Sequence, residues 1–357
     1  MRNDQIINFF LKLVAIDSPS GEEKNVSQFI FQYLKNLNLH PKKDKNDQIY
    51  CSINNNPSKK PILFCAHLDT VEPGRNIKPV IRSDYITSDG KTILGADNKV
   101  AVASILYAIS ELISEKINVE LVFSVREETD GGIKQFNYHQ LRSKVGFVFD
   151  LTDESMERVI LKAPYIDDFV FQFYGKLSHA ARPEQGINVL SHFLACFSQL
   201  SLGRVDKETT FNIGIISGGR ATNSVPDYLE VKGDLRSLNK KKFFTLKKRI
   251  EEKINFYSNK TKVKADVRWL PYCCGYHIKV NDSYYLRLKK IYDEKFNLKL
   301  KPIVSSGGSD ASFLNTIGIK TFCLGDGAVN SHSLEERVKI SNLIRLKEIV
   351  KALIRYF

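Results

Sequence analysis

The sequence predicts an α/β protein, a mixed sheet with helices on both faces, into which a smaller α+β domain is inserted. Several short apolar runs bounded by turns are typical of the interior strands of a largely parallel sheet. Between residues 166 and 272, strands and helices instead follow the order strand-helix-strand-strand-helix-strand of a ferredoxin-like unit. We therefore expect one domain built from residues 1–165 and 273–357, with residues 166–272 as the insert.

Composition favours a water-soluble protein of the cytoplasm. The chain has 357 residues, of which 43% are hydrophobic and 26% are charged. No apolar stretch approaches the roughly 18–20 residues of a membrane helix, and the N-terminal residues lack the pattern of a secretory signal. The six cysteines show no CxxC spacing, which argues against a zinc ribbon or a disulfide framework. We expect no membrane partner.

The formal net charge of +13 raises the question of nucleic-acid binding. The lysines are spread over the whole chain, and no helix-turn-helix, RNP-like strand or zinc finger accompanies them. We therefore interpret them as solvated surface and expect no nucleic-acid partner.

Elements before the insert alternate between helical and extended patterns. Apolar spacing predicts helices over 4–14 and 22–37, and Ser20 is placed to cap the second. The elements expected after them are strands at 49–53, 62–66, 118–125 and 145–149, a hairpin or irregular connection over 75–91, and a helix over 99–113.

The insert and the C-terminal part follow the same two periodicities. In the insert we expect strands at 166–174, 210–216, 228–235 and 262–270 and helices at 188–200 and 240–257. After it we expect helices at 283–295 and 340–354, a turn at 305–310 that leads into a helix, a strand at 320–324 and a polar loop at 326–332.

The strand at 62–66 ends in His67 and Asp69, whose side chains should point to the same face of an extended chain. This pair suits a metal ligand and a carboxylate that orients it, although a hydrogen-bonded buried histidine would look the same. Asp97 follows a short apolar segment, 93–94, at an expected strand-to-helix junction, where a simple helix cap is the alternative.

Acidic residues also follow the next two strands, Glu127 and Glu128 after the first and Asp150 at the end of the second. Adjacent carboxylates are costly to bury unless a cation shares their site. Because ligands gather at the carboxyl ends of parallel strands, the imidazole and the carboxylates together indicate a site for divalent metal ions.

The combination of motifs resembles the M20 metallopeptidases, and most closely the peptidase T-like aminopeptidases. The catalytic motifs that carry the resemblance are AHLDT (66–70), GADNKVAVA (95–103), REE (126–128), FVFD (147–150) and SHSLEERV (331–338). Those of the insert and the substrate loop are SHAARPEQGIN (178–188), GGRATNSVPD (218–227), GDLRS (233–237) and GGSDA (307–311). The resemblance spans essentially the whole chain and implies a phosphorylase/hydrolase-like zinc-peptidase domain with an inserted lid.

By this resemblance the site holds two Zn²⁺ ions per subunit, with Co²⁺ or Mn²⁺ as alternatives. The implied metal ligands are His67, Asp97, Glu128, Asp150 and His332, with Asp97 bridging the two ions. Glu127 would be the general base and Asp69 would lie behind His67. The family also implies a cis peptide bond between Asp97 and Asn98.

The insert would act as a lid and dimerisation domain that makes a homodimer and contributes to substrate binding. His179 would reach a substrate carbonyl, Asn223 would make a polar contact and Arg236 would hold a carboxylate, while Gly308 would offer backbone N–H groups. A structural role is the alternative for His179, an ion pair for Arg236, and a tight turn for Gly308.

The function we expect is an aminopeptidase that removes the N-terminal residue from short peptides such as tripeptides. An M20-type N-acyl-amino-acid deacylase would use the same metals and base, so it remains the alternative. A protein that has kept the fold but lost catalysis is more remote, because the ligands and the base are all present.

Overall fold

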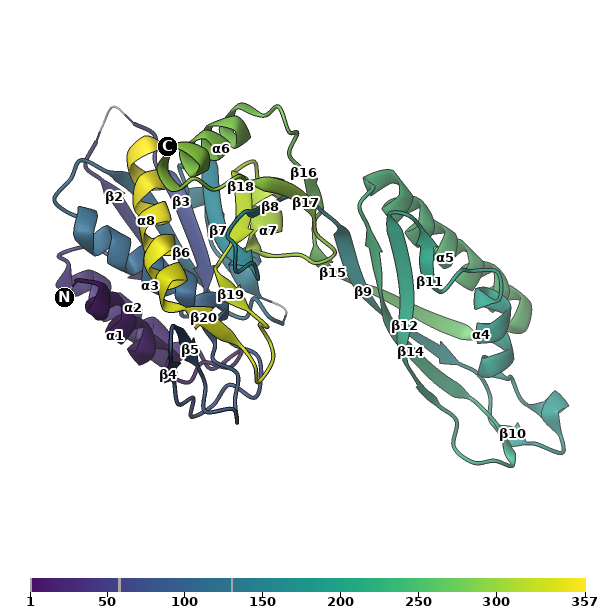
Figure 1. Ribbon diagram of the computed structural model, residues 1–357. Coiled ribbons are helices and arrows are strands. Elements are labelled where there is room, and N and C mark those ends of the chain that lie inside the picture. The colour runs from purple at the N-terminus through teal and green to yellow at the C-terminus, as the bar shows by residue number, and fades with distance from the viewer. Residues whose placement is uncertain (1, 57–58, 130) are drawn as a thin grey trace. The chain divides into compact units, whose positions relative to one another are not determined.

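The computed structural model describes residues 2–56, 59–129 and 131–357 (Figure 1). The chain forms two compact units. The first consists of the residues up to Leu161 with His277–Ser305 and Ser309–Phe357, and the second of Lys162–Tyr276 with Ser306–Gly308. Among the described residues, no helix is both long and apolar enough to span a membrane.

The first unit is built on a nine-stranded mixed sheet. Its strand order is β1-β2-β6-β3-β7-β18-β8-β16, and β17 pairs with β8 outside this path. The strand bounds are β1 Lys42–Lys43, β2 Ile49–Asn54, β3 Ile62–His67, β6 Asn118–Ser124, β7 Val145–Leu151, β8 Arg158–Ala163, β16 Tyr276–His277, β17 Lys301–Val304 and β18 Lys320–Gly325.

The centre of this sheet is parallel, as the unbroken apolar runs predict. Strands β6, β3, β7 and β18 run in one direction, whereas β2 and β8 are antiparallel to their neighbours β6 and β18. Phe64, Phe147 and Phe322 form an aromatic row across three of the parallel strands, with ring centroids 5.6 and 6.2 Å apart. The observed mixed sheet confirms the predicted α/β class.

Helices pack on this sheet and on one another. α3 contacts β3, β7, α1 and α8, and α7 contacts β7 and β18. The helix bounds are α1 Arg2–Val14, α2 Lys24–Asn36, α3 Ala96–Leu112, α6 Ser283–Phe296, α7 Asp310–Thr316 and α8 Ile340–Tyr356. α3 buries nearly its whole surface, which explains why its sequence is apolar on every side.

A small four-stranded sheet, β19-β20-β5-β4, completes the first unit. Its strands are β4 Val80–Arg82, β5 Tyr85–Thr87, β19 Ala328–Val329 and β20 Arg337–Lys339. It joins the hairpin of residues 80–87 to the segment that carries His332.

The second unit is an antiparallel sheet covered by two helices. Its strand order is β11-β12-β14-β9-β15. Phe169, Phe171 and Phe173 alternate along β9 and are buried with residues of α4 and α5. The bounds are β9 Tyr165–Tyr174, α4 Val189–Phe197, β11 Gly203–Asp206, β12 Thr209–Gly218, β14 Tyr228–Ser237, α5 Lys240–Thr261 and β15 Lys264–Cys273. This separate antiparallel sheet is consistent with the predicted lid.

Three local predictions were wrong. Ser20 does not cap α2, whose N-cap is Glu23; the Ser20 hydroxyl instead donates to Asp69 Oδ2 at 2.7 Å. Residues 93–94 are buried but form no strand, and α3 begins after Gly95, so Asp97 is not a helix cap. The expected polar loop 326–332 begins with buried residues, Asp326 among them, and contains β19.

Candidate metal centre

The carboxyl ends of the parallel strands place His67 at the middle of a cluster of carboxylates. Its Nε2 lies 3.2 Å from Asp97 Oδ1 and 3.6 Å from Asp150 Oδ1. Its Nδ1 lies 3.1 Å from the carbonyl oxygen of Asp69 and 3.5 Å from the Asp69 carboxylate. The imidazole therefore turns one nitrogen toward Asp69 and the other toward Asp97 and Asp150.

Asp97 faces two histidines, one with each carboxylate oxygen. Besides the contact of Oδ1 with His67, its Oδ2 lies 3.4 Å from His332 Nε2. The following peptide bond, to Asn98, is cis, as the family resemblance implies. Within α3, Asp97 and Asn98 depart from helical backbone angles.

Glu336 holds the backbone around Asp97. Its buried carboxylate accepts hydrogen bonds from the N–H groups of Leu94 (2.8 Å), Gly95 (2.7 Å) and Asp97 (3.0 Å). Burial is the main cause that raises the pKa of Glu336 to about 7, and the charge of Asp97 adds to it. Glu336 directly precedes β20, in the loop between β19 and β20 of the small sheet. Its hydrogen bonds therefore connect this loop to the start of α3.

Asp69 holds the turn that follows β6. Its two oxygens accept from the N–H groups of Glu127 (3.0 Å) and Glu128 (3.1 Å). The preceding residue, Arg126, has a positive φ of 59°, and its N–H donates to Glu23 Oε1 at 3.0 Å. Two buried carboxylates therefore fix three successive N–H groups of this turn.

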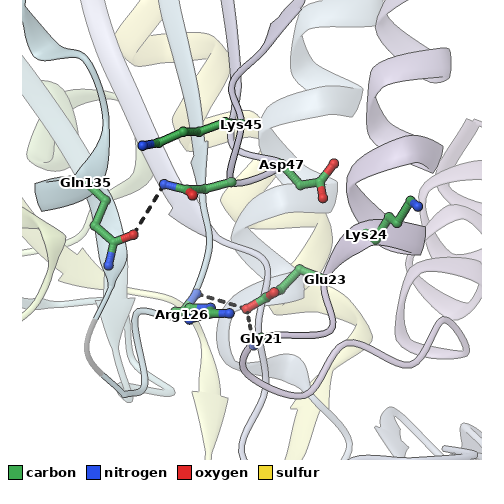
Figure 2. Close-up of a pocket in the computed structure, with 8 residues that line it drawn as sticks. Gly21, Glu23, Lys24, Lys45, Asp47, Arg126 and Gln135 are labelled. Atoms are coloured by element: carbon green, nitrogen blue, oxygen red, sulfur yellow. Dashed lines mark hydrogen bonds between the residues drawn. The ribbon is translucent and has the colours of Figure 1, made fainter.

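A polar cavity of about 220 Å³ adjoins the same turn (Figure 2). Glu23 and Arg126 lie together on one side of it, and the amide of Asn46 donates to Gln135 Oε1 at 3.3 Å on another. The remaining lining residues are Gly21, Lys24, Lys45 and Asp47. Lys24 and Lys45 point away from each other in Figure 2, so they do not converge on a common ligand position.

Glu128 and His332 meet on the other side of Asp97. His332 Nε2 lies 2.7 Å from Glu128 Oε1. The hydrogen bonds to Asp97 and Glu128 raise the pKa of His332 to about 10. In the metal-free protein, His332 is thus a cation held between two carboxylates.

Asp150 and Glu127 lie beside His67, in a group of three possible metal ligands. Burial, with the negative charges of Asp97 and Glu128, raises the pKa of Asp150 to about 7. Burial is also the main cause that raises the pKa of Glu127 well above its usual value, with Asp150 adding to it. For His67, burial lowers the pKa, but neighbouring carboxylates outweigh this effect and raise it well above its usual value.

The gathered donors form two overlapping candidate metal groups. His67 with Asp97 and Glu128 is one, and His67 with Glu127 and Asp150 is the other; within each group the ligand atoms lie within 4.8 Å of one another. Imidazole nitrogens and carboxylate oxygens are the donors that zinc and related divalent ions take. The excess of buried negative charge is costly without cations, so these residues fit a metal centre.

The predicted substrate-binding residues belong to the second unit and fall into two pairs. His179 and Asn223 are neighbours: β10, Ser178–His179, pairs with β13, Ser224–Val225, and Ala180 N–H donates to the Asn223 carbonyl at 2.9 Å. Arg236 lies near the other end of β14 and donates to the carbonyl of Ser306 at 3.1 Å, in the loop that contains Gly308.

The sequence had suggested no role for Glu336, only a cis peptide bond for Asn98, and for Glu23 only a place in the first turn of a helix. Asn98 Nδ2 donates to the Phe149 carbonyl at 2.5 Å and lies 3.4 Å from Asp150 Oδ1, so it joins α3 to the end of β7. Glu336 stands in the motif SHSLEERV, and this position was the available signal. Glu23 also accepts from the nearby N–H of Gly21 at 2.7 Å, but its contact with Arg126, about 100 residues away in the chain, has no local signal in the sequence.

Comparison with known proteins shows the family to which the chain belongs. Residues 63–356 match Peptidase family M20/M25/M40. The uncharacterized protein YqjE of Bacillus subtilis is 30% identical over 367 residues, which cover 98% of this chain and 97% of that protein.

Two crystal structures are similar over 99% of this chain and 98% of their own. Aminopeptidase PepT from Bacillus cereus superposes with a TM-score of 0.90 at 28% identity. A tripeptidase from Staphylococcus aureus superposes with a TM-score of 0.90 at 29% identity. The chain therefore belongs to Peptidase family M20/M25/M40, the metallopeptidases that its sequence resembles.

Proposed function

We propose that this M20 metallopeptidase is a di-zinc aminopeptidase that removes the N-terminal residue from short peptides. The observation that carries the proposal is the placement of Asp97 between two imidazoles, with one oxygen toward His67 (3.2 Å) and the other toward His332 (3.4 Å). A carboxylate in this position suits a bridge between two ions. Asp150 would complete the ligands on the His67 side, and Glu128 those on the His332 side.

The residues around the ions would set their geometry. The contact of His67 Nδ1 with Asp69 leaves Nε2 free as a ligand, which is the arrangement that orients metal-binding histidines. Bound zinc would supply Lewis acidity that activates a water molecule and polarises a carbonyl group.

Glu127 is the proposed general base. Its N–H is fixed by Asp69, and its carboxylate lies in the group with His67 and Asp150. A raised pKa suits a carboxylate that takes a proton from water and passes it to the leaving amine. Glu128, on the same turn, contacts His332 instead, so the two neighbours can hold separate roles.

His179 is proposed to donate a hydrogen bond to the substrate carbonyl. Its Nδ1 accepts the N–H of Ala181 at 3.1 Å, so the neutral ring carries its proton on Nε2. That N–H is available as a donor because the side chain is exposed. Asn223, beside it, would make a further polar contact.

Arg236 and Gly308 are proposed to bind the substrate carboxylate. Arg236 uses Nε for Asp234 (2.7 Å) and one N–H of Nη1 for Ser306, which leaves its remaining N–H groups for a carboxylate. The same contact holds the loop whose Gly308 would offer its backbone N–H. Recognition of a free carboxylate would favour short peptides.

The experiment that tests the function is a substrate comparison. The zinc-loaded protein is incubated with dipeptides, tripeptides and N-acetyl amino acids, and the products are identified by mass spectrometry. The proposal expects release of the N-terminal residue from tripeptides. Faster release of acetate from N-acetyl amino acids would favour the deacylase, which the metal centre fits equally well.

We also propose that residues 166–272 form the ferredoxin-like lid through which two copies associate. Among the described residues, the outer edge of β12 pairs with β11 only near its start, at 209–211, and leaves 212–218 unpaired on that side. Ile215 and Ile216 on this segment are 58% and 53% exposed. An open edge with exposed apolar side chains favours pairing with a second copy. Sedimentation of the wild type and of an Ile215→Lys variant tests this, and a monomeric wild type would refute it.

A cytoplasmic location remains our proposal, because the structure shows all six cysteines as free thiols.

A further inference from the structure

Asp326 lies directly beyond the strand end that neighbours Asp150. It follows β18, whose last residue, Gly325, is in register with Leu151 of β7. The N–H of Asp326 donates to the Leu151 carbonyl at 3.0 Å. The carboxyl group of Asp326 therefore stands one strand away from a proposed metal ligand, on the same edge of the sheet.

This carboxyl group is buried and only half satisfied. Asp326 is 1% exposed. Its Oδ1 accepts from the N–H groups of Ala328 (3.0 Å) and Asp153 (3.4 Å), whereas its Oδ2 is buried and has no hydrogen-bond partner in the described part of the chain. Burying such an oxygen unpaired costs free energy.

The charges around Asp326 make this cost larger. Burial is the main cause that raises its pKa well above the usual value, and the carboxylates of Asp97 and Asp150 add to it. No lysine, arginine or histidine forms an ion pair with Asp326 within the described ranges, whereas neighbouring Asp153 has Arg158 at 3.1 Å. Asp326 is thus a buried acid without an ion-pair partner in the described part of the chain, and it lies in the electrostatic field of two further, largely buried carboxylates.

We propose that Asp326 strengthens the metal centre from behind its ligands: its negative charge raises the affinity for divalent cations without touching them. The inference deepens the proposed function, because it assumes the metal centre at His67 and His332. A carboxylate placed there destabilises the metal-free protein and is compensated when cations bind nearby. Residues behind metal ligands commonly change metal affinity by about 10- to 100-fold.

The test uses Asp326→Asn, which keeps the size of the side chain and an acceptor for the Ala328 N–H. Zinc affinity is measured by competition with a chromophoric chelator at fixed pH and salt, and the melting temperature is measured on the metal-free protein. We expect zinc to bind about 10- to 100-fold more weakly. We also expect the metal-free variant to melt above the wild type, because an acid whose pKa is raised by burial costs stability above its usual pKa, and the amide does not titrate.

Glu120→Gln is the matched control. Glu120 is also fully buried in the first unit, but its carboxylate accepts hydrogen bonds from Tyr50, Arg142 and Ser143. Its amide variant should lower the melting temperature and leave zinc affinity unchanged. Comparing the two variants thus distinguishes a carboxylate that increases zinc affinity from one that stabilises the fold.

A second variant, Asp326→Ser, keeps a hydroxyl acceptor and must show a similar loss of zinc affinity. Unchanged zinc affinity in either Asp326 variant would overturn the proposal, as would a metal-free Asp326→Asn protein that melts below the wild type. The readout is metal binding and not turnover. A wild type that binds zinc but cleaves no peptide would therefore refute the proposed function and leave this inference standing.

Discussion

Glu336 offers a sharp test of how the fold positions Asp97, the proposed bridging carboxylate. Replacing it by glutamine keeps the shape but turns one acceptor oxygen into a donor. Oε2 takes the N–H groups of Leu94 and Gly95, and Oε1 takes the N–H of Asp97. A glutamine that keeps the first two bonds must turn its amide nitrogen toward the N–H of Asp97. That buried donor is then unsatisfied, at a cost of about 1–3 kcal/mol.

The lost charge acts in the opposite direction. Burial raises the pKa of Glu336 from 4.5 to about 7. Ionisation therefore costs stability progressively above pH 4.5 and in full above pH 7, by about 3 kcal/mol. The neutral amide removes this cost at pH 8. The two effects nearly cancel, so we expect the free energy of unfolding of the metal-free protein to change by less than about 2 kcal/mol.

Zinc affinity, in contrast to the stability of the metal-free protein, should decrease in Glu336→Gln. With the Asp97 N–H released, the proposed bridging carboxylate would be less well positioned, and we expect zinc affinity to fall about 10- to 100-fold. Chelator competition measures the affinity, and urea unfolding of the metal-free protein measures the stability. Glu335→Gln, an exposed neighbour, is the control and should match the wild type. Wild-type zinc affinity in Glu336→Gln would refute the role given to these hydrogen bonds.

Three further predictions concern the proposed ligands, the base and the lid. Glu127→Ala should retain both metals yet lose several orders of magnitude in kcat, whereas His332→Ala should lose one zinc. Elemental analysis measures the metal content of each variant, and steady-state kinetics measures its kcat. Equal metal loss in both variants would contradict the roles proposed for Glu127 as base and His332 as ligand. Zinc affinity should rise with pH between 6 and 8, at least about tenfold per unit, because zinc bound at the proposed site would displace protons from His332, whose pKa is raised to about 10, and from His67, whose pKa is also raised. A flat titration by chelator competition would contradict this. His179→Ala should keep its metal content and lose kcat, and normal turnover would make His179 structural.

The strands and their terminal residues could be predicted because their signals are local. An apolar run that stops at His67 or Asp150 indicates a buried strand, and it also indicates which polar side chain lies at the carboxyl end of that strand. The parallel order of the strands then brings these ends to one edge of the sheet. The types of the proposed metal ligands, and the edge of the sheet at which they meet, can therefore be predicted from the sequence.

The supporting contacts could not be predicted, because they join segments far apart in the chain. Glu336 acts on residues about 240 positions earlier, and Glu23 on Arg126 about 100 positions later. Ser20 illustrates the resulting error: a serine just before a helix is typical of a cap, but its hydroxyl is used by Asp69 of a distant strand. Asp326 looked like a loop residue because its burial depends on β7 and on the small sheet.

The central claim is that residues from distant segments of the chain bind two divalent cations in one metal centre. The most direct measurement is elemental analysis of protein stripped of metal, supplied with excess zinc and then freed of unbound ions. We expect two tightly held zinc ions per chain, and one in His332→Ala. Purified protein that retains no zinc after this treatment would contradict it.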